Sequence, residues 1–503
     1  MSDAGGDERA RILEAAALSR LRTVAPLILP DGEHVGGLVQ RGSGALLNEL
    51  ARVVREQHRS DTLWLLMVAL TGAFPTADQV RKTRRALQHA VPETAFVSFV
   101  GACSELATRS ENLDVEIDVV SNGVVVDVDF CATNSHNTGI QRVVRHTVSR
   151  WSVNRAPTLV AWTPRGGAMR TIDTVERNRV VAWGKKQQAT TEVKSPPRVV
   201  VPFRSDVIIA EVPRYEICDP LAALAEFSGN SVAVVGYDAI PVVSADTVPT
   251  AETERYVRYL SVVKHARLVA GISRAATEEF GGFSRTLAAQ GLPGPTTVEV
   301  PLPVDAPDVA FAKQTAAGTR PMVLCVGSQE PRKNHDAVLY AANVLWREGL
   351  DFSLRFIGGG SLWFTRGFDQ RVRALAAAGR DILVLRGVDD STMLEHYHQA
   401  RFTMFPSLHE GYGLPVAESL ALNTPVITTN YGSTAEIAEG GGCLLVDPRD
   451  DESMVRAMRD LLVDDALLAR LQDQIARRPN RSWDEYAKDL WSTLVREAED
   501  ALA

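Results

Sequence analysis

Two basic residues stand where a strand gives way to a helix in the second half of the chain. Residues 325–334 read CVGSQEPRKN. A strand-like run ends near Gly327, and Arg332 and Lys333 directly precede a helical pattern that starts near Asn334. Helix N-termini attract anions, because the helix dipole and the free backbone N–H groups point at the same place. The spacing therefore predicts a diphosphate site, and a solvated Arg-Lys pair that caps a loop is the alternative.

A second strand-to-helix junction carries two glutamates. Residues 405–419 read FPSLHEGYGLPVAES, with Glu410 in the loop and Glu418 expected in the first turn of the following helix. Glycines let the backbone of such a loop approach a ligand closely, and proline suits a first helical turn. Carboxylates repel phosphates, so the glutamates fit sugar and ribose hydroxyls, whereas the helix N-terminus fits a leaving diphosphate. A helix-capping glutamate beside an unrelated loop glutamate is the alternative.

The two junctions together resemble the signatures of the family-4 retaining glycosyltransferases of the GT-B fold. A glutamate pair with seven residues between its members and an internal GYGLP is similar to the donor signature of that family. The run VGSQEPRKN is similar to its phosphate-binding loop. Further similar features are the glycines at 358–360, GV at 387–388, TAE at 434–436 and LVDP at 445–448. The resemblance covers about residues 120–500 and implies two Rossmann-like domains that face a cleft.

The resemblance implies a role for each matching position. Lys333 and Arg332 would bind the donor diphosphate in the loop that begins at Gly327. Glu418 would hold the ribose hydroxyls, and Glu410 would contact the transferred sugar and the distal phosphate. The other donor-side candidates are Gly411, Tyr412, Gly413 and Leu414, through their backbone, Val388, whose backbone would lie near the base, and Glu436, the weakest.

The first half of the chain offers a loop for the opposite side of the cleft. Residues 137–142 read NTGIQR between a strand and a helix. This run resembles the glycine loop that closes over the donor in mannosyl- and rhamnosyltransferases of bacterial surface-polysaccharide pathways. Gly139 is the candidate there, whereas Gln141 and Arg142 fit a helix surface equally well.

A departure from the family pattern follows a later strand. Relatives often carry His-Asp where this chain has Tyr237 and Asp238, so the usual polar contact of the histidine is lost. Asp238 is the candidate proton acceptor in its place. An aspartate that caps the turn at the end of the strand is the alternative.

Metal chemistry is not expected. Asp127 and Asp129 form a D-x-D, the metal-binding signature of the other large glycosyltransferase fold. We expect a structural role for them, because they alternate within a strand-like run nearly 300 residues before the donor signature. The five cysteines are scattered and form no C-x-x-C pair, which disfavours a disulfide framework or a zinc site. We therefore expect no metal and no cofactor beyond the nucleoside diphosphate sugar.

Alternating strands and helices must position these residues. The expected strands of one domain are residues 322–326, 353–357, 382–385, 402–405 and 425–428, with helices such as 335–347 and 391–400. In the preceding domain the expected strands are residues 115–120, 124–130, 158–163, 231–237, 268–272 and 296–300, with helices such as 140–151 and 251–265. Such alternation predicts two doubly wound α/β domains with parallel sheets, whose ligands sit beyond the carboxyl ends of the strands.

The same pattern divides the chain into four parts. Residues 1–113 are expected to form a helical accessory domain, with a buried helix in 62–74 and a helix start at Thr76. Residues 114–306 would form the acceptor-side domain and residues 320–480 the nucleotide-sugar-binding domain. The segment 306–320, rich in Ala, Gly, Thr and Pro, is the expected linker, and residues 481–503 are expected to form a C-terminal helix.

The overall composition fits a globular protein with real cores. The 503 residues carry 54 Lys and Arg against 62 Asp and Glu, a net charge of −8, which disfavours a general nucleic-acid binder. The first eleven residues are polar and unlike a signal peptide, and the apolar stretch 62–74 is too short to span a bilayer. We expect a cytoplasmic protein, with peripheral contact at the inner face of a membrane and a homodimer left open.

The resemblance also implies the reaction. A hexose would move from a nucleoside diphosphate sugar to an acceptor hydroxyl with retention of configuration, by same-face attack assisted by the leaving phosphate. GDP-mannose is the first expected donor, with UDP-hexose and dTDP-rhamnose open, and the acceptor is a saccharide or a lipid-linked saccharide. The alternatives are a sugar-nucleotide epimerase of the same fold and a non-catalytic nucleotide-sugar-binding scaffold.

Overall fold

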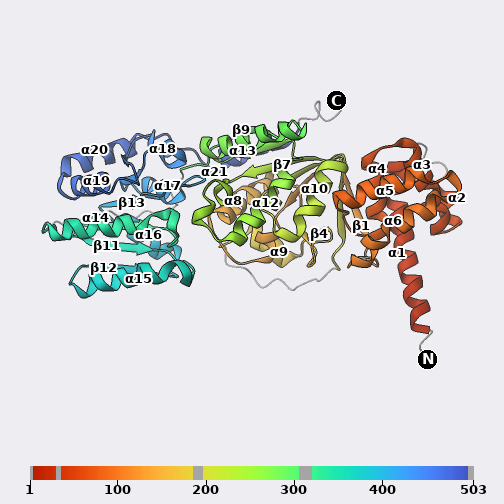
Figure 1. The fold of residues 1–503 in the computed structure, drawn as a ribbon, viewed down its shortest axis with the longest axis horizontal. Coiled ribbons are helices and arrows are strands. Elements are labelled where there is room, and N and C mark those ends of the chain that lie inside the picture. The colour runs from red at the N-terminus through yellow and green to blue at the C-terminus, as the bar shows by residue number, and fades with distance from the viewer. Residues whose placement is uncertain (1–3, 30–34, 185–195, 305–319, 497–503) are drawn as a thin grey trace.

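The computed structural model describes residues 4–29, 35–184, 196–304 and 320–496. Three parts follow one another along its longest axis: a helical region, a middle domain on a nine-stranded sheet and a C-terminal domain on a six-stranded sheet (Figure 1). All but one residue of the linker expected at 306–320 lies outside the described residues. Among the described helices, none combines the length and the apolar character that a membrane span requires.

The N-terminal part is helical, as the sequence predicts. Thr76 and Gln79 form a capping box at the start of one helix, which confirms the helix start expected there. The predicted apolar stretch 62–74 includes most of a helix whose residues are almost all buried. The described helices of this part are α1 (Ala4–Ile28), α2 (Val35–Gln40), α3 (Ser43–Gln57), α4 (Ser60–Thr71), α5 (Ala77–His89) and α6 (Ala95–Arg109).

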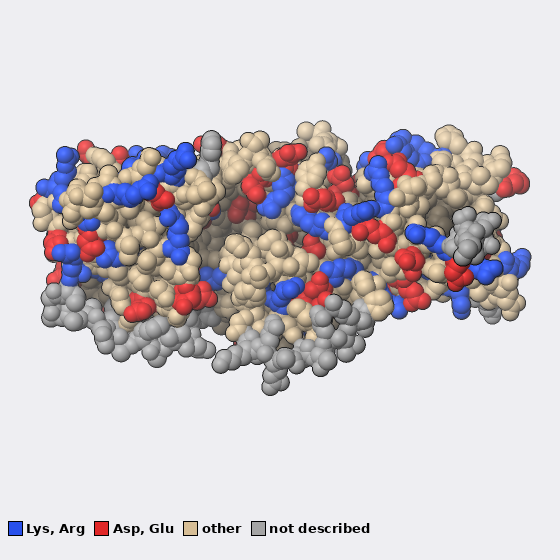
Figure 2. All heavy atoms as spheres, turned by 90° about the horizontal axis from the view of Figure 1, so that it is seen from below, with Lys and Arg blue, Asp and Glu red and all other residues tan. Residues whose placement is uncertain are grey.

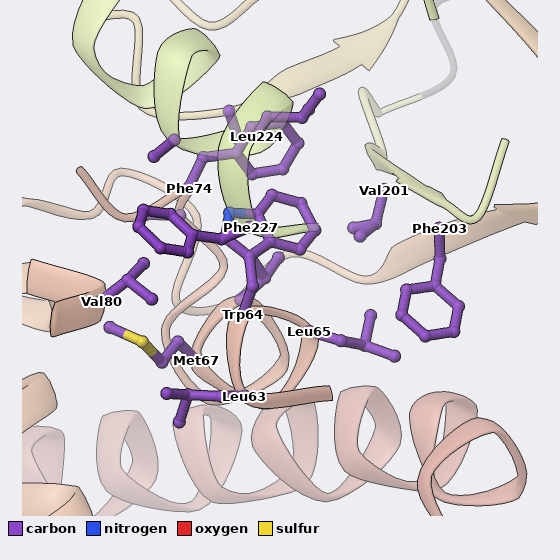
Figure 3. Close-up of a cluster of buried hydrophobic side chains, with 14 of the residues drawn as sticks. Leu63, Trp64, Leu65, Met67, Phe74, Val80, Val201, Phe203, Leu224 and Phe227 are labelled. Carbon is purple, nitrogen blue, oxygen red and sulfur yellow. The ribbon is translucent and has the colours of Figure 1, made fainter. Parts of the chain in front are cut away.

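The helical part shares one hydrophobic core with the middle domain. Trp64 of α4 packs edge-on against Phe74, with ring centroids 5.1 Å apart, and side chains of the middle domain close over both (Figure 3). Arg20 of α1 is buried, and its guanidinium donates hydrogen bonds to the carbonyl oxygens of Ala69 and Leu113 at 2.8 and 2.6 Å. The helices are therefore anchored to the sheet domain.

The middle sheet has the strand order β1-β5-β4-β3-β2-β6-β7-β8-β9 and is parallel except at β4, which runs antiparallel to both neighbours. The strand expected at 124–130 ends at Asp127, and Asp129 already begins a helix, so the two aspartates do not alternate along one strand. The strands are β1 (Ile117–Ser121), β2 (Val124–Asp127), β3 (Thr158–Trp162), β4 (Met169–Thr171), β5 (Val199–Phe203), β6 (Asp206–Ile209), β7 (Ser231–Gly236), β8 (Leu268–Gly271) and β9 (Thr296–Glu299).

Helices connect and cover these strands. Between β2 and β3 lie α7 (Asp129–Thr133) and α8 (Gly139–Asn154), and α9 (Thr174–Val181) follows β4. The later helices are α10 (Cys218–Phe227), α11 (Ile240–Val243), α12 (Thr250–Val263) and α13 (Arg274–Thr286).

The C-terminal sheet is entirely parallel, with the order β12-β11-β10-β13-β14-β15. This is the order of a doubly wound dinucleotide-binding sheet. Its strands are β10 (Met322–Val326), β11 (Ser353–Ile357), β12 (Ile382–Leu385), β13 (Phe402–Phe405), β14 (Val426–Thr429) and β15 (Cys443–Val446). Its helices are α14 (His335–Arg347), α15 (Leu362–Ala377), α16 (Asp390–Gln399), α17 (Leu414–Ala421), α18 (Gly432–Ala438), α19 (Asp451–Val463) and α20 (Asp465–Ala476).

Each sheet has one point where the strand order reverses. In the C-terminal sheet the reversal lies between β10 and β13, and in the middle sheet between β2 and β6. Ligands of open α/β sheets bind in the crevice outside the carboxyl ends of the strands at such a point. The fold therefore offers two such crevices, one in each sheet.

A helix beyond the C-terminal sheet returns to the middle domain. This helix, α21 (Trp483–Leu494), packs on α8, where the indole of Trp151 donates a hydrogen bond to the carbonyl oxygen of Ala487 at 2.7 Å. It matches the described part of the helix expected at 481–503. On the face shown in Figure 2, acidic and basic side chains are interspersed.

Candidate active site

The reversal point of the C-terminal sheet gathers two cations around one carboxylate. The loop after β10 carries Arg332 and Lys333, and the loop after β13 carries Glu410. Oε1 of Glu410 lies 2.6 Å from Nζ of Lys333 and 2.9 Å from Nη1 of Arg332, and it accepts a hydrogen bond from Ser407 at 2.5 Å. The two junctions singled out in the sequence thus meet in space.

Burial and the neighbouring charges set the pKa of the Glu410 carboxyl. Burial alone would raise the pKa of the Glu410 carboxyl, but Lys333 and then Arg332 outweigh it and hold that pKa at about 2. Lys333 is only 7% exposed. The Glu410 carboxyl therefore stays ionised at neutral pH, whereas burial lowers the pKa of Lys333 against the opposing effect of Glu410. The mouth of the sheet thus holds a buried carboxylate between two basic side chains.

Glu418 lies on the helix that follows the loop of Glu410. It is the fifth residue of α17, so the expectation that it falls in the first turn is wrong; it lies one turn further in. Its carboxylate forms an ion pair with Arg142 of α8, in the middle domain, and accepts a hydrogen bond from the hydroxyl of Tyr397 at 2.9 Å. Arg142 thus belongs to the site. Gln141, the residue before it, instead completes a capping box with Thr138.

Glycines bring the two domains into close contact here. A Cβ on Gly411 would lie 2.4 Å from the carbonyl oxygen of Tyr237, so any side chain at this position would collide with the backbone of the other domain. Gly413 has φ 110°, which favours glycine, and its backbone starts α17. A Cβ on Gly139 would meet the side chain of Leu414 at 3.1 Å, so the glycine loop of the middle domain abuts the donor loop.

The position that departs from the family pattern has a structural explanation. The side chain of Tyr237 is 4% exposed and its hydroxyl donates to the carbonyl oxygen of Ala210 at 2.7 Å, inside the core of the middle domain. Asp238 follows at the end of β7, where Oδ1 accepts from the backbone N–H of Ile240 at 3.1 Å. Burial raises the pKa of Asp238 to about 6, against the opposing effect of Arg332. Asp238 therefore caps a turn and also titrates near neutrality.

One contact across the domain boundary was not found from the sequence. His409, next to Glu410, places Nε2 2.5 Å from Oε1 of Glu279 on α13 and Nδ1 2.7 Å from the hydroxyl of Ser244. Burial lowers the pKa of His409, but the hydrogen bond and charge of Glu279 outweigh it and raise the pKa overall. Nothing local in the sequence marks this histidine, because both of its partners come from the other domain.

The other residues predicted from the sequence make contacts within the protein. Gly327 donates its N–H to Ile357 at 2.9 Å, and Val388 packs partly buried in the apolar cluster that contains Tyr397. The hydroxyl of Tyr412 donates to the carbonyl oxygen of Leu302 at 2.9 Å, in the middle domain. Glu436 accepts the N–H groups of Arg274 and Ala275 at 2.9 and 2.7 Å, so it caps α13 across the domain boundary.

No group of three or more His, Cys, Asp or Glu side chains among the described residues has the arrangement to hold a metal ion. Asp127 and Asp129 are therefore not part of such a group. The expectation of a metal-independent site stays a prediction.

Comparison with known proteins assigns part of the chain. Residues 308–478 match the model of the family "Glycosyl transferases group 1". A segment of 133 residues, 26% of the chain, is 35% identical to the serotype-specific mannosyltransferase WbdA of Escherichia coli and spans 16% of that protein's length. A segment of 208 residues, 40% of the chain, is 26% identical to the GDP-mannose-dependent alpha-(1-6)-phosphatidylinositol monomannoside mannosyltransferase of Mycolicibacterium smegmatis and spans 54% of it.

Solved structures share the architecture. The structure of alpha,alpha-trehalose 6-phosphate synthase from Burkholderia multivorans superposes with a TM-score of 0.53 at 12% sequence identity, over 76% of this chain and 100% of that one. At this identity the likeness shows the fold, which is GT-B. Lys333 and Glu410, at the reversal point of the second sheet, thus lie in the segment that matches the glycosyl transferases group 1 model, within a chain that has the GT-B fold.

Proposed function

We propose that the protein transfers a hexose from a nucleoside diphosphate sugar to an acceptor hydroxyl with retention of configuration, and that mannose from GDP-mannose is the first donor to test. The buried cations at the reversal point carry the proposal: Arg332 and Lys333 converge on a single carboxylate directly before α17. A mannosyltransferase named as GDP-mannose-dependent is among the relatives, which supports the choice of donor.

The donor would occupy the C-terminal side of the cleft. Its diphosphate would lie between Lys333, Arg332 and the N-terminus of α17, whose N–H groups and dipole favour negative charge. The ribose hydroxyls would bond to the carboxylate of Glu418, which Tyr397 already orients. Ribose and Arg142 compete for that carboxylate, so donor binding would release the Arg142 side chain toward the phosphates.

Stabilisation of the charges that develop on the sugar and the diphosphate would decide the rate of transfer. As the glycosidic bond breaks, the sugar gains oxocarbenium character and the diphosphate gains negative charge, which preorganised cations stabilise without rearrangement. Glu410 would bond to a hydroxyl of the transferred sugar, because its low pKa keeps it an acceptor throughout. The leaving phosphate would take the proton of the acceptor hydroxyl on the same face. Asp238, beside the loop of Glu410, titrates in a range that suits a transient proton store.

The decisive experiment measures nucleotide binding and transfer together. Thermal unfolding of wild type is followed with GDP, UDP, dTDP and their sugars, because a ligand that binds only the folded state raises the melting temperature. Lys333→Met should abolish the shift, whereas Lys82→Met, on α5 far from the cleft and exposed, should leave it intact. If no nucleotide at millimolar concentration raises the melting temperature of wild type, the proposed donor site is contradicted.

Product analysis completes the test. Incubation with the stabilising nucleotide sugar and a panel of oligosaccharides should give an elongated saccharide whose new linkage has the donor's anomeric configuration. An inverted linkage would contradict retention. Conversion of the donor sugar without acceptor would point to an epimerase, and binding without any conversion would point to a scaffold.

A further inference from the structure

The loop between α7 and α8, residues 134–138, is exposed along its whole length. It leads into Gly139, which meets Leu414 of the donor loop across the domain boundary. An exposed segment without regular structure normally samples many conformations. A loop that must meet the other domain in one arrangement therefore needs contacts from the interior of its own domain to hold it.

A single buried guanidinium, that of Arg145 on α8, supplies such contacts. The residue is 4% exposed, and its Nη2 donates to the carbonyl oxygen of Asn134 at 3.2 Å. Its Nη1 donates to the carbonyl oxygen of His136 at 2.8 Å and to Oδ1 of Asn137 at 2.6 Å. Its Nε donates to the carbonyl oxygen of Arg179 on α9 at 3.1 Å. Four of the five N–H groups of the guanidinium are thus bonded, three of them to loop 134–138.

The acceptors of Arg145 are all uncharged. Among the described residues, no carboxylate forms an ion pair with this guanidinium. Burial lowers the pKa of Arg145, which reflects the cost of holding a cation away from water. An apolar side chain would fill the same space without that cost. What the guanidinium adds to the protein is therefore its set of bonds to the loop.

The guanidinium is itself held in place by α9 and the residues after it. The ring of Trp183 lies against it, with the ring centroid 3.6 Å from Cζ of Arg145. Arg179 of α9 donates to the carbonyl oxygen of Ala132 at 2.9 Å, in the helix that ends where the loop begins. The loop and its support are thus tied to the same helix, which restricts both to one arrangement.

Arg145 also decides which end of the Asn137 amide faces outward. A guanidinium only donates hydrogen bonds, so the amide oxygen must face it and the amide nitrogen must face away. The Asn137 side chain is exposed, and its Nδ2 makes no hydrogen bond with the described part of the chain. Two N–H groups are thus left for oxygen atoms of a ligand, two residues before Gly139.

The same helix contacts the donor side of the boundary through Arg142. Arg142 and Arg145 are three residues apart on α8, so their side chains project from neighbouring positions. Arg142 pairs with Glu418 of α17. The contacts of Lys333 and Arg332 with Glu410 lie within the C-terminal domain and do not involve α8. Loss of Arg145 would therefore disturb the side of the site built by the middle domain and spare the cations.

We propose that Arg145 is a positioning residue for transfer, which holds loop 134–138 in the shape that presents Gly139 and the Asn137 amide to the bound donor. It touches no substrate and acts through the loop. The inference rests on the proposed function for its effect on transfer, whereas its effect on the order of the loop is independent of what the protein catalyses. Arg145 should govern the rate of transfer more than the affinity for nucleotide, which is held from the C-terminal domain.

The first test is hydrogen exchange, measured by mass spectrometry on the full chain, in the peptide that spans residues 130–142. The backbone N–H of Asn134 bonds to Phe130 at 2.9 Å and that of Thr138 to Gln141 at 3.2 Å, so both are protected when the loop is ordered. In Arg145→Met we expect exchange about tenfold faster there, the loss of about one charge-assisted hydrogen bond, and no change in the C-terminal domain.

The matched control is Arg150→Met. Arg150 lies on the same helix, but it pairs with Asp484 of α21 and makes no contact with loop 134–138. We expect wild-type exchange in residues 130–142 for this variant, even where its free energy of unfolding falls.

The second test separates kcat from KM for the donor, with the nucleotide sugar that stabilises wild type. In Arg145→Met we expect kcat to fall at least about tenfold while KM changes less than about threefold, and the melting-temperature shift with the nucleoside diphosphate to persist. Rates are normalised to the measured number of nucleotide-binding sites, so that an unfolded fraction does not lower kcat. Arg145→Lys keeps the cation without the planar fork and should recover part of kcat. Arg150→Met should keep the wild-type kcat.

The outcomes separate this inference from the proposed function. Unchanged exchange in Arg145→Met, or equal acceleration in Arg145→Met and Arg150→Met, would overturn the ordering of the loop by Arg145. A normal kcat in Arg145→Met, or the same fall in both variants, would overturn its role in transfer. If wild type transfers no sugar, the proposed function fails and the effect on transfer fails with it, whereas hydrogen exchange still decides whether Arg145 orders the loop.

Discussion

Buried carboxyl groups occur at both reversal points of this chain, and their surroundings give them opposite properties. In the C-terminal sheet, Glu410 touches Lys333 and Arg332 and has a pKa of about 2. In the middle sheet, Asp127 accepts only neutral N–H groups and lies near Asp129 and Glu211, and its pKa is about 8. Both side chains are buried to a similar degree, so the neighbouring charges, and not burial, decide the difference.

The two carboxyl groups belong to two kinds of polar site. The donor-side group is a set of full charges, suited to stabilise a leaving diphosphate. In the middle domain, the raised pKa of Asp127 favours its protonated form, which can donate as well as accept a hydrogen bond.

Removal of the Lys333 side-chain amine from beside Glu410 should have the largest effect. Lys333→Met leaves Glu410 with one cation in place of two, and a buried charge pair broken from one side costs about 3 kcal/mol. We expect a lower free energy of unfolding, measured by urea titration, and a loss of transfer of at least about a hundredfold. The double variant Lys333→Met/Glu410→Gln should regain stability and remain inactive. A double variant no more stable than the single one would show that the pair is not what stabilises this loop.

The pH dependence of stability should distinguish the two groups. The raised pKa of Asp127 means that the folded state holds a proton that the unfolded state releases, so this group's contribution is largest below about pH 4 and declines as the pH rises toward 8. The depressed pKa of Glu410 gives the opposite sign: its contribution is full above about pH 4.5 and is lost as the pH falls through about 2. Of these two side chains, only Asp127 changes its contribution to the free energy of unfolding between about pH 4.5 and 8.

Asp127→Asn should therefore flatten the stability profile. We expect wild type to lose about 1 kcal/mol per pH unit more than the variant between about pH 5 and 7, in urea titrations at each pH. Asp118→Asn, at a half-buried position of β1, serves as the control and should follow wild type. Parallel slopes for Asp127→Asn and wild type would mean that Asp127 is ionised like an ordinary aspartate.

A smaller effect is expected for the two glutamates that contact the other domain. Glu418→Gln should weaken nucleotide binding about tenfold in calorimetry, because a neutral amide holds ribose hydroxyls less well than a carboxylate. Glu436→Gln, which alters only the cap of α13, should bind nucleotide like wild type. Equal weakening in both would indicate that domain contact, and not ribose recognition, governs affinity.

The smallest effect should come from His409. Its raised pKa means that the ion pair with Glu279 stabilises fully below about pH 6.5 and fades as the pH rises through the folded-state pKa. His409→Gln should speed amide exchange in α13 at low pH and leave it unchanged at high pH. Hydrogen-exchange mass spectrometry at two pH values measures this, and a pH-independent difference would assign the contact to packing.

The meeting of Arg332, Lys333 and Glu410 could be predicted because the sequence signal of each is local. Each lies in a loop between an apolar strand and a helix, and the strands expected at 322–326 and 402–405 coincide with β10 and β13. Arg142 could not be assigned, since its partner Glu418 is 276 positions away and belongs to another domain.

The cavity lined by Asp127, Asp129 and Glu211 in the middle domain was missed for a related reason. The strands β5 and β6 are separated only by Arg204 and Ser205, so the sequence did not reveal where one ends, and Glu211 was not placed at a strand end. The strand expected at 124–130 also ran past Asp127 into α7, which hid the change of direction that brings Asp129 to the cavity. Neither carboxyl could be assigned until strand order was known.

The return of α21 to the middle domain constrains how the protein is made. Leu490 and Leu494 of this helix are buried in the same cluster as Trp151. A ribosome releases α21 only after the entire C-terminal sheet, so during synthesis the groove on α8 stays open while the helical region beside β1 and β5 is already complete. The middle domain therefore completes its packing only after the C-terminal sheet has been synthesised, although it precedes that sheet in the chain.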